Sequence, residues 1–105
     1  MNIKQIHTVK ENLITLTAAY QDASSKVLTA SRAFNEEKAE LIVVGVEGKN
    51  VAERDANLGL MLQDTSKALQ QAEDAQTLVR NQLELARIEY DLLKMELRFL
   101  EIGSR

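Results

Sequence analysis

The sequence predicts an all-α fold, a long antiparallel helical hairpin that associates with further copies of itself. The 105-residue chain has no Pro and only four Gly, which leaves little of the turn chemistry that sheet folds need. Apolar residues recur at alternating steps of three and four in both halves of the chain, as in coiled coils. The only close pair of glycines, Gly45 and Gly48, lies mid-chain. We therefore expect one helical-hairpin domain over residues 1–105.

The first helix is expected over residues 3–46, because its apolar seam keeps a constant register. That seam comprises Ile6, Val9, Leu13, Leu16, Tyr20, Ala23, Val27, Ala30, Phe34, Leu41 and Val44. A period of 3.5 residues predicts a left-handed supercoil, and Ala23 and Ala30 allow close approach of a partner helix. Glu37 is the one polar residue in the series. Either it sets the register, or the seam ends before the turn.

A turn is expected over residues 47–50. Gly48 suits the left-handed residue that follows a helix C-terminus, so we expect a positive φ there. Asn50, with Glu53 three residues later, fits an N-cap with a capping box. The next helix should therefore begin near Val51.

The second half is expected to form helices over residues 51–63 and 65–102. Gly59 weakens the first of these, and Asp64-Thr65-Ser66 offers a new N-cap, so a break is expected near residues 63–65. The alternative is one uninterrupted helix over residues 51–102.

The last helix carries two apolar series on nearly opposite sides. The inner series comprises Leu69, Ala72, Gln76, Val79, Leu83, Ala86, Tyr90, Leu93, Leu97 and Leu100. The outer series comprises Leu78, Leu85, Ile88, Leu92, Met95, Phe99 and Ile102. The first helix can cover only one of them. We expect Leu85, Ile88, Leu92, Met95 and Phe99 to mediate self-association, with a dimer as the default state.

No combination of residues predicts catalysis or a bound cofactor or metal. There is no Cys, His7 is the only histidine, and no serine has a Gly-x-Ser-x-Gly context. Glu36, Glu37 and Glu40 form the densest carboxylate group, which we interpret as a solvated helix surface rather than a metal site. Gly45-Val46-Glu47-Gly48-Lys49-Asn50 differs from a phosphate-binding loop in its glycine spacing and its lack of Ser or Thr. We therefore expect no enzyme.

The charge balance bears on partners and location. Thirteen Lys and Arg against 16 Asp and Glu give a net charge of −3, so nucleic acid is not expected as a direct ligand. No stretch has the roughly 18 consecutive apolar residues of a membrane span. We expect a cytoplasmic protein with no membrane association.

The block Glu47-Gly48-Lys49-Asn50-Val51-Ala52-Glu53-Arg54 resembles a Glu-Gly-Lys-Asn-x-x-Glu-Arg motif. That motif is associated with small, uncharacterised helical proteins from early gene clusters of bacteriophages and prophages. The resemblance covers about a tenth of the chain and implies the cytoplasm of a host cell. The chain also has the length of secreted helical hairpins with a Trp-x-Gly turn, but it contains no Trp.

Three functions remain open. The first is a non-catalytic, homo-oligomeric interaction protein, an adaptor or inhibitor of a host or phage protein, with Lys49, Asn50 and Arg54 at the hairpin tip as its contact site. The second is an oligomer that sequesters a small molecule such as a nucleotide. The third is an accessory protein of phage recombination or replication. Nucleotide co-purification would favour the second, and salt-sensitive retention on DNA the third.

Overall fold

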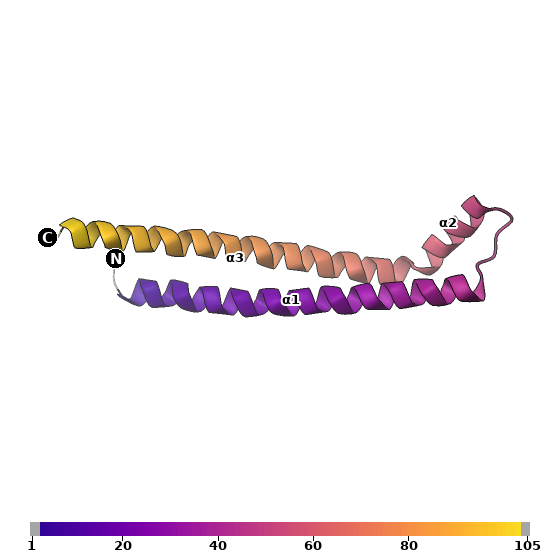
Figure 1. Cartoon of the computed structure of the whole chain (residues 1–105), viewed down its shortest axis with the longest axis horizontal. Helices are drawn as coiled ribbons and strands as arrows, with labels where there is room; N and C mark the ends of the chain where they lie inside the picture. The colour runs from indigo at the N-terminus through magenta and orange to yellow at the C-terminus, as the bar shows by residue number, and fades with distance from the viewer. Residues whose placement is uncertain (1–2, 104–105) are drawn as a thin grey trace. The chain divides into compact units, whose positions relative to one another are not determined.

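The computed structural model describes residues 3–103, so residues 1–2 and 104–105 of the predicted domain lie outside it. It contains three helices, α1 (Ile3–Val44), α2 (Val51–Met61) and α3 (Gln63–Gly103), and no strand within the described range (Figure 1). The predicted all-α helical hairpin is confirmed, since α1 and α3 run antiparallel. The described residues divide into two compact units, one of residues 3–22 with 77–103 and the other of residues 23–76.

The first unit pairs the start of α1 with the second part of α3. The first turns of α1 lie beside the part of α3 that carries Glu89 and Leu93, and the last turns of α3 extend beyond the start of α1 (Figure 1). Its buried side chains are Val9 from α1 and Leu83 and Ala86 from α3, all members of the predicted seams. A core between only two helices is thin, and most other seam residues are half-buried. Side chains on the outer surfaces of these helices have no layer above them.

The second unit contains the rest of α1, the turn, α2 and the start of α3. Ala23 and Leu62 are its buried apolar residues. A polar contact crosses the seam between α1 and α3, where Gln76 Nε2 donates to Ser24 Oγ at 3.0 Å. Both residues are half-buried, so this bond fixes how the two helices are aligned at that level.

The turn begins earlier than residue 47, and the expected positive φ at Gly48 is wrong. Helix α1 ends at Val44, and Gly45 has a φ of +93°, the only positive φ among the described residues. The Gly45 amide donates to Leu41 O at 2.9 Å and completes the last turn of α1. Gly45 and Gly48 could each adopt the left-handed conformation that follows a helix. Because α1 ends at Val44, the residue that adopts it is Gly45.

Gly48 is instead required by close packing. A Cβ atom there would lie 2.7 Å from both the amide nitrogen and Cγ of Arg54, and 3.0 Å from its Cα. Arg54 Nε also donates to Gly48 O at 3.3 Å. The loop therefore passes directly against the first turn of α2, where only a glycine fits without displacement.

The start of α2 agrees with the sequence prediction. Asn50 has an extended backbone, and its side-chain oxygen accepts from the Glu53 amide at 2.8 Å. Glu53 Oε2 accepts from the Lys49 amide at 3.3 Å. The Glu53 carboxylate thus reaches back to the loop as in a capping box, but it binds the amide of Lys49, the residue before the N-cap, rather than the amide of the N-cap itself.

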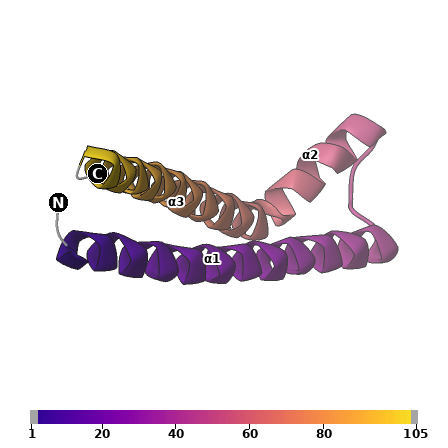
Figure 2. The ribbon, with the colours of Figure 1, turned by 60° about the vertical axis from the view of Figure 1, so that its left-hand side comes forward.

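Helix α2 ends at Met61 and α3 begins at Gln63, so the uninterrupted helix over 51–102 is wrong. The break lies at Leu62, just before the predicted 63–65, and turns α2 away from the direction of α3 (Figure 2). Leu62 is 4% exposed, and its carbonyl accepts from the Thr65 hydroxyl at 3.1 Å. Burial of this side chain, rather than an N-cap at Asp64, accompanies the change of direction.

Candidate interaction surfaces

A row of exposed apolar side chains follows the outer side of α3, and we define the seven residues of the outer series as the outer stripe. Their exposed fractions are Leu78 60%, Leu85 67%, Ile88 56%, Leu92 55%, Met95 54%, Phe99 73% and Ile102 68%. On the opposite side of the same helix, Leu83 and Ala86 are only 4% and 3% exposed. Helix α1 thus covers the inner series as far as Leu97, whereas Leu100 at its end is 57% exposed. The outer stripe is open along its whole length, as the two-series pattern predicts.

The C-terminal end of the outer stripe contains a hollow between its apolar side chains. Met95, Arg98, Phe99 and Ile102 enclose a shallow hollow of about 180 Å³. These residues stand at i, i+3, i+4 and i+7, the four positions that form the hole for a knob side chain when helices pair. The hollow therefore has the size and lining to receive one apolar side chain.

Charged residues border the outer stripe. The Lys94 ammonium lies 3.7 Å from the Asp91 carboxylate and 4.9 Å from the centre of the Tyr90 ring. At this exposure such contacts contribute little to stability. Neither Glu84 nor Arg98 makes a side-chain hydrogen bond or ion pair with any residue in 3–103. Their charges remain available to a molecule that covers the stripe.

The three predicted contact residues at the tip have different local roles. Asn50 caps α2, and the Arg54 guanidinium bonds the loop at Gly48 O. Lys49 is exposed, and its backbone amide bonds Glu53. Of the three, Lys49 alone has a side chain to which the structure gives no role in closing the turn, within the part of the chain that it describes.

An apolar groove beside the turn was not predicted from the sequence. Gly45, Val46, Glu47, Asn57, Leu60 and Met61 line an open groove of about 510 Å³. A hydrogen bond joins the loop and α2 beside this groove, where Asn57 Nδ2 donates to Glu47 O at 2.7 Å. Leu60 and Met61 are 69% and 53% exposed. Leu60 and Met61 are adjacent apolar residues outside the inner series, and this feature of the sequence could have revealed the groove.

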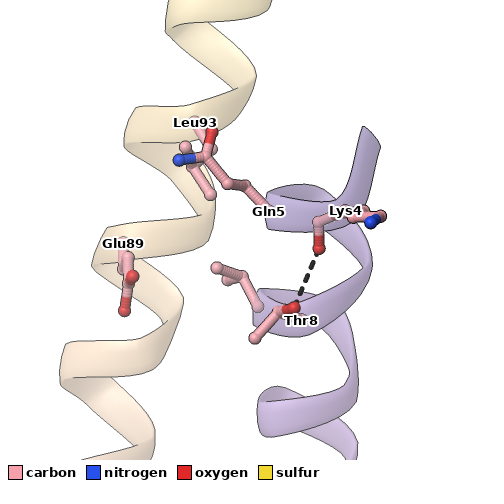
Figure 3. Close-up of a pocket in the computed structure, with 6 residues that line it drawn as sticks. Lys4, Gln5, Thr8, Glu89 and Leu93 are labelled. Atoms are coloured by element: carbon pink, nitrogen blue, oxygen red, sulfur yellow. Dashed lines mark hydrogen bonds between the residues drawn. The ribbon is translucent and has the colours of Figure 1, made fainter. Parts of the chain in front are cut away.

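A third depression lies between α1 and α3 in the first unit. Lys4, Gln5, Thr8, Val9, Glu89 and Leu93 line an open groove of about 320 Å³ (Figure 3). Gln5 extends across it toward Leu93, and the Thr8 hydroxyl donates back to Lys4 O at 2.8 Å (Figure 3). Its polar groups do not converge on a common point, unlike those of a ligand site.

The remaining candidate groups do not come together. His7 is exposed, as are Glu36 and Glu40, whereas Glu37 is half-buried on the seam. In residues 3–103, no three His, Asp or Glu side chains are placed to hold a metal ion. No helix within that range is both long and apolar enough to cross a membrane.

Comparisons with known protein families, curated proteins and solved structures found no match to this chain.

Proposed function

We propose that this chain is a non-catalytic interaction protein that works as a homo-oligomer. The observation that carries the proposal is the outer stripe, seven large apolar side chains that are each more than half exposed. Burying such a side chain contributes about 1.5–3 kcal/mol, so covering the stripe is strongly favourable. An apolar surface of this extent is typical of an interface rather than of a solvated helix.

The turn supports the second part of the proposal, contact with another protein. The groove of Val46, Leu60 and Met61 lies in the same unit as the exposed Lys49, at a distance from the outer stripe along the chain. Binding surfaces are commonly carried by loops on a rigid scaffold. The resemblance of this turn to phage early-gene proteins favours an adaptor or inhibitor in the cytoplasm of a host cell.

Self-association is tested by sedimentation equilibrium of the purified chain from 1 to 50 µM. The expected mass is at least twice the monomer mass of 11.8 kDa. Leu92→Glu should weaken self-association by about 100-fold or more, because it removes an apolar contact from each copy and buries a carboxylate. Ile14→Glu is the matched control, since Ile14 on α1 is 62% exposed against 55% for Leu92. A monomer throughout this range, or equal effects of the two variants, would contradict the proposal.

Partner contact is tested by quantitative affinity capture from host cells. The combined variant Lys49→Ala and Arg54→Ala should remain folded and oligomeric but lose the proteins that the unmodified chain retains. Because Arg54 also bonds the loop, Lys49→Glu alone and Leu60→Ser alone are included. Unchanged capture by all three variants would remove the turn from the proposal.

A further inference from the structure

The occupant of the outer stripe is identified by the charges that border it, given the self-association proposed above. Leu85, Ile88, Leu92, Met95, Phe99 and Ile102 form an uninterrupted apolar run at heptad spacing. The preceding position of that pattern is polar, Asn81, so the apolar run starts at Leu85. Each of these six side chains exposes on the order of 100 Å², so pairing the run with a second copy buries on the order of 1,200 Å², the lower bound for a stable interface.

Charged and polar side chains lie in two rows, one on each side of this run, and we call these rows its flanks. The first flank carries Glu84, Asp91 and Arg98, and the second carries Gln82, Glu89 and Glu96. In a parallel pair, a residue of the first flank contacts the residue five positions later on the second flank of the partner helix. Glu84 would meet Glu89 of the partner subunit, and Asp91 would meet Glu96 of the partner subunit. A parallel dimer thus has four acid–acid contacts and no opposite-charge contact between its flanks.

In an antiparallel pair each flank meets its own counterpart. When the runs from Leu85 to Ile102 of two copies pack antiparallel and overlap completely, the two-fold axis of the dimer falls between Leu92 and Met95. Asp91 then meets Arg98 of the partner subunit, twice per dimer. Acid–acid contacts fall from four to two, between Glu89 and Glu96 of the partner subunit.

The apolar layers and the hollow fit the same arrangement. Leu85 lies against Ile102 of the partner subunit, Leu92 against its Met95, and Ile88 against its Phe99, so every layer is apolar. The hollow formed by Met95, Arg98, Phe99 and Ile102 receives Ile88 of the partner subunit. Asn81 lies outside the overlap. We propose that two copies pair antiparallel through the α3 run from Leu85 to Ile102.

Cysteine cross-linking tests the orientation, because the chain contains no cysteine of its own. Ile88→Cys and Phe99→Cys are prepared as separate full-length chains, mixed under reducing conditions and then oxidised. The antiparallel pair places residue 88 beside residue 99 of the partner and holds like residues about 17 Å apart, beyond the Cα separation that a disulfide spans. We expect the mixed disulfide in the mixture and little dimer from either variant alone. Ile14→Cys on α1 measures collisional cross-linking.

Charge exchange gives an independent readout. Arg98→Glu should weaken self-association about ten-fold, because two attractive contacts become repulsive, and adding Asp91→Lys should restore most of the affinity. In a parallel pair Arg98 faces Gly103 of the partner subunit, so the same change has little effect. Arg80→Glu, outside the overlap, is the control and should leave the affinity unchanged.

The outcomes separate the two proposals. Monomers in the sedimentation experiment overturn both self-association and this pairing. Oligomers that give like-with-like disulfides, or neither disulfide, overturn the antiparallel pairing and leave self-association standing. Oligomers that give the mixed disulfide, together with sensitivity to Arg98→Glu, support it.

Discussion

The turn offers a quantitative test, because Gly45 and Gly48 are required there for different reasons, whereas Gly59 in α2 is not required. In Gly48→Ala, the added Cβ would lie 2.7 Å from the Arg54 amide nitrogen. Backbone atoms cannot rotate away as a flexible side chain can, so the loop or the first turn of α2 must shift. That turn is tied to the loop by the Asn50 cap, at 2.8 Å. Forced overpacking typically costs about 1–3 kcal/mol, and we expect a loss of this size in the free energy of unfolding.

The other two glycines provide matched comparisons. A Cβ atom at Gly45 would meet nothing within 4 Å, but its φ of +93° strains any other residue, so Gly45→Ala should cost about 1–2 kcal/mol. Gly59 lies within α2, and nothing lies within 4 Å of an added Cβ. Gly59→Ala should therefore stabilise the protein by about 0.5–1 kcal/mol, because alanine loses less backbone entropy in a helix.

Urea unfolding followed by circular dichroism measures all three variants. Protein concentration must be the same throughout, because self-association adds to the apparent stability. The expected order of stability is Gly59→Ala, unmodified protein, Gly45→Ala and Gly48→Ala, with the last two close together. A Gly48→Ala variant as stable as Gly59→Ala would refute the close approach of the loop to Arg54. Gly48→Val should be at least as damaging as the alanine change, because its larger side chain meets the same Arg54 atoms.

Four further substitutions, in three experiments, test the contacts within the hairpin. Asn50→Ala should cost about 1 kcal/mol by removing the cap of α2, and an unchanged melting temperature would show that the cap is unimportant. A double-mutant cycle of Ser24→Ala and Gln76→Ala should give a coupling free energy of about 0.5–1.5 kcal/mol, whereas additive effects would mean that their 3.0 Å hydrogen bond contributes nothing. Glu37→Leu should stabilise the hairpin by about 1 kcal/mol, because Glu37 is half-buried on an apolar seam and its side chain has no hydrogen-bond or ion-pair partner in residues 3–103. Destabilisation by Glu37→Leu would instead favour its role in setting the register.

The sequence by itself determined the helices and which of their sides are apolar. Heptad spacing is a local property, because side chains three and four residues apart share one side of a helix whatever packs against it. The prediction therefore distinguished Leu83 and Ala86, which are buried, from Leu85 and Ile88, which are exposed. The Asn50 cap was equally predictable, since it involves only residues three positions apart.

Only the tertiary structure decided the details of the turn, the helix break and the polar contact across the seam. Gly45 and Gly48 are both suitable for a left-handed residue, and the choice depended on where α1 stops. The contact of the loop with Arg54 and the burial of Leu62 depend on how α2 packs, which spacing along the chain does not specify. Gln76 and Ser24 are 52 positions apart, and only the alignment of α1 with α3 brings them together. Long-range contacts such as these follow from packing, whereas caps and helix surfaces follow from local geometry.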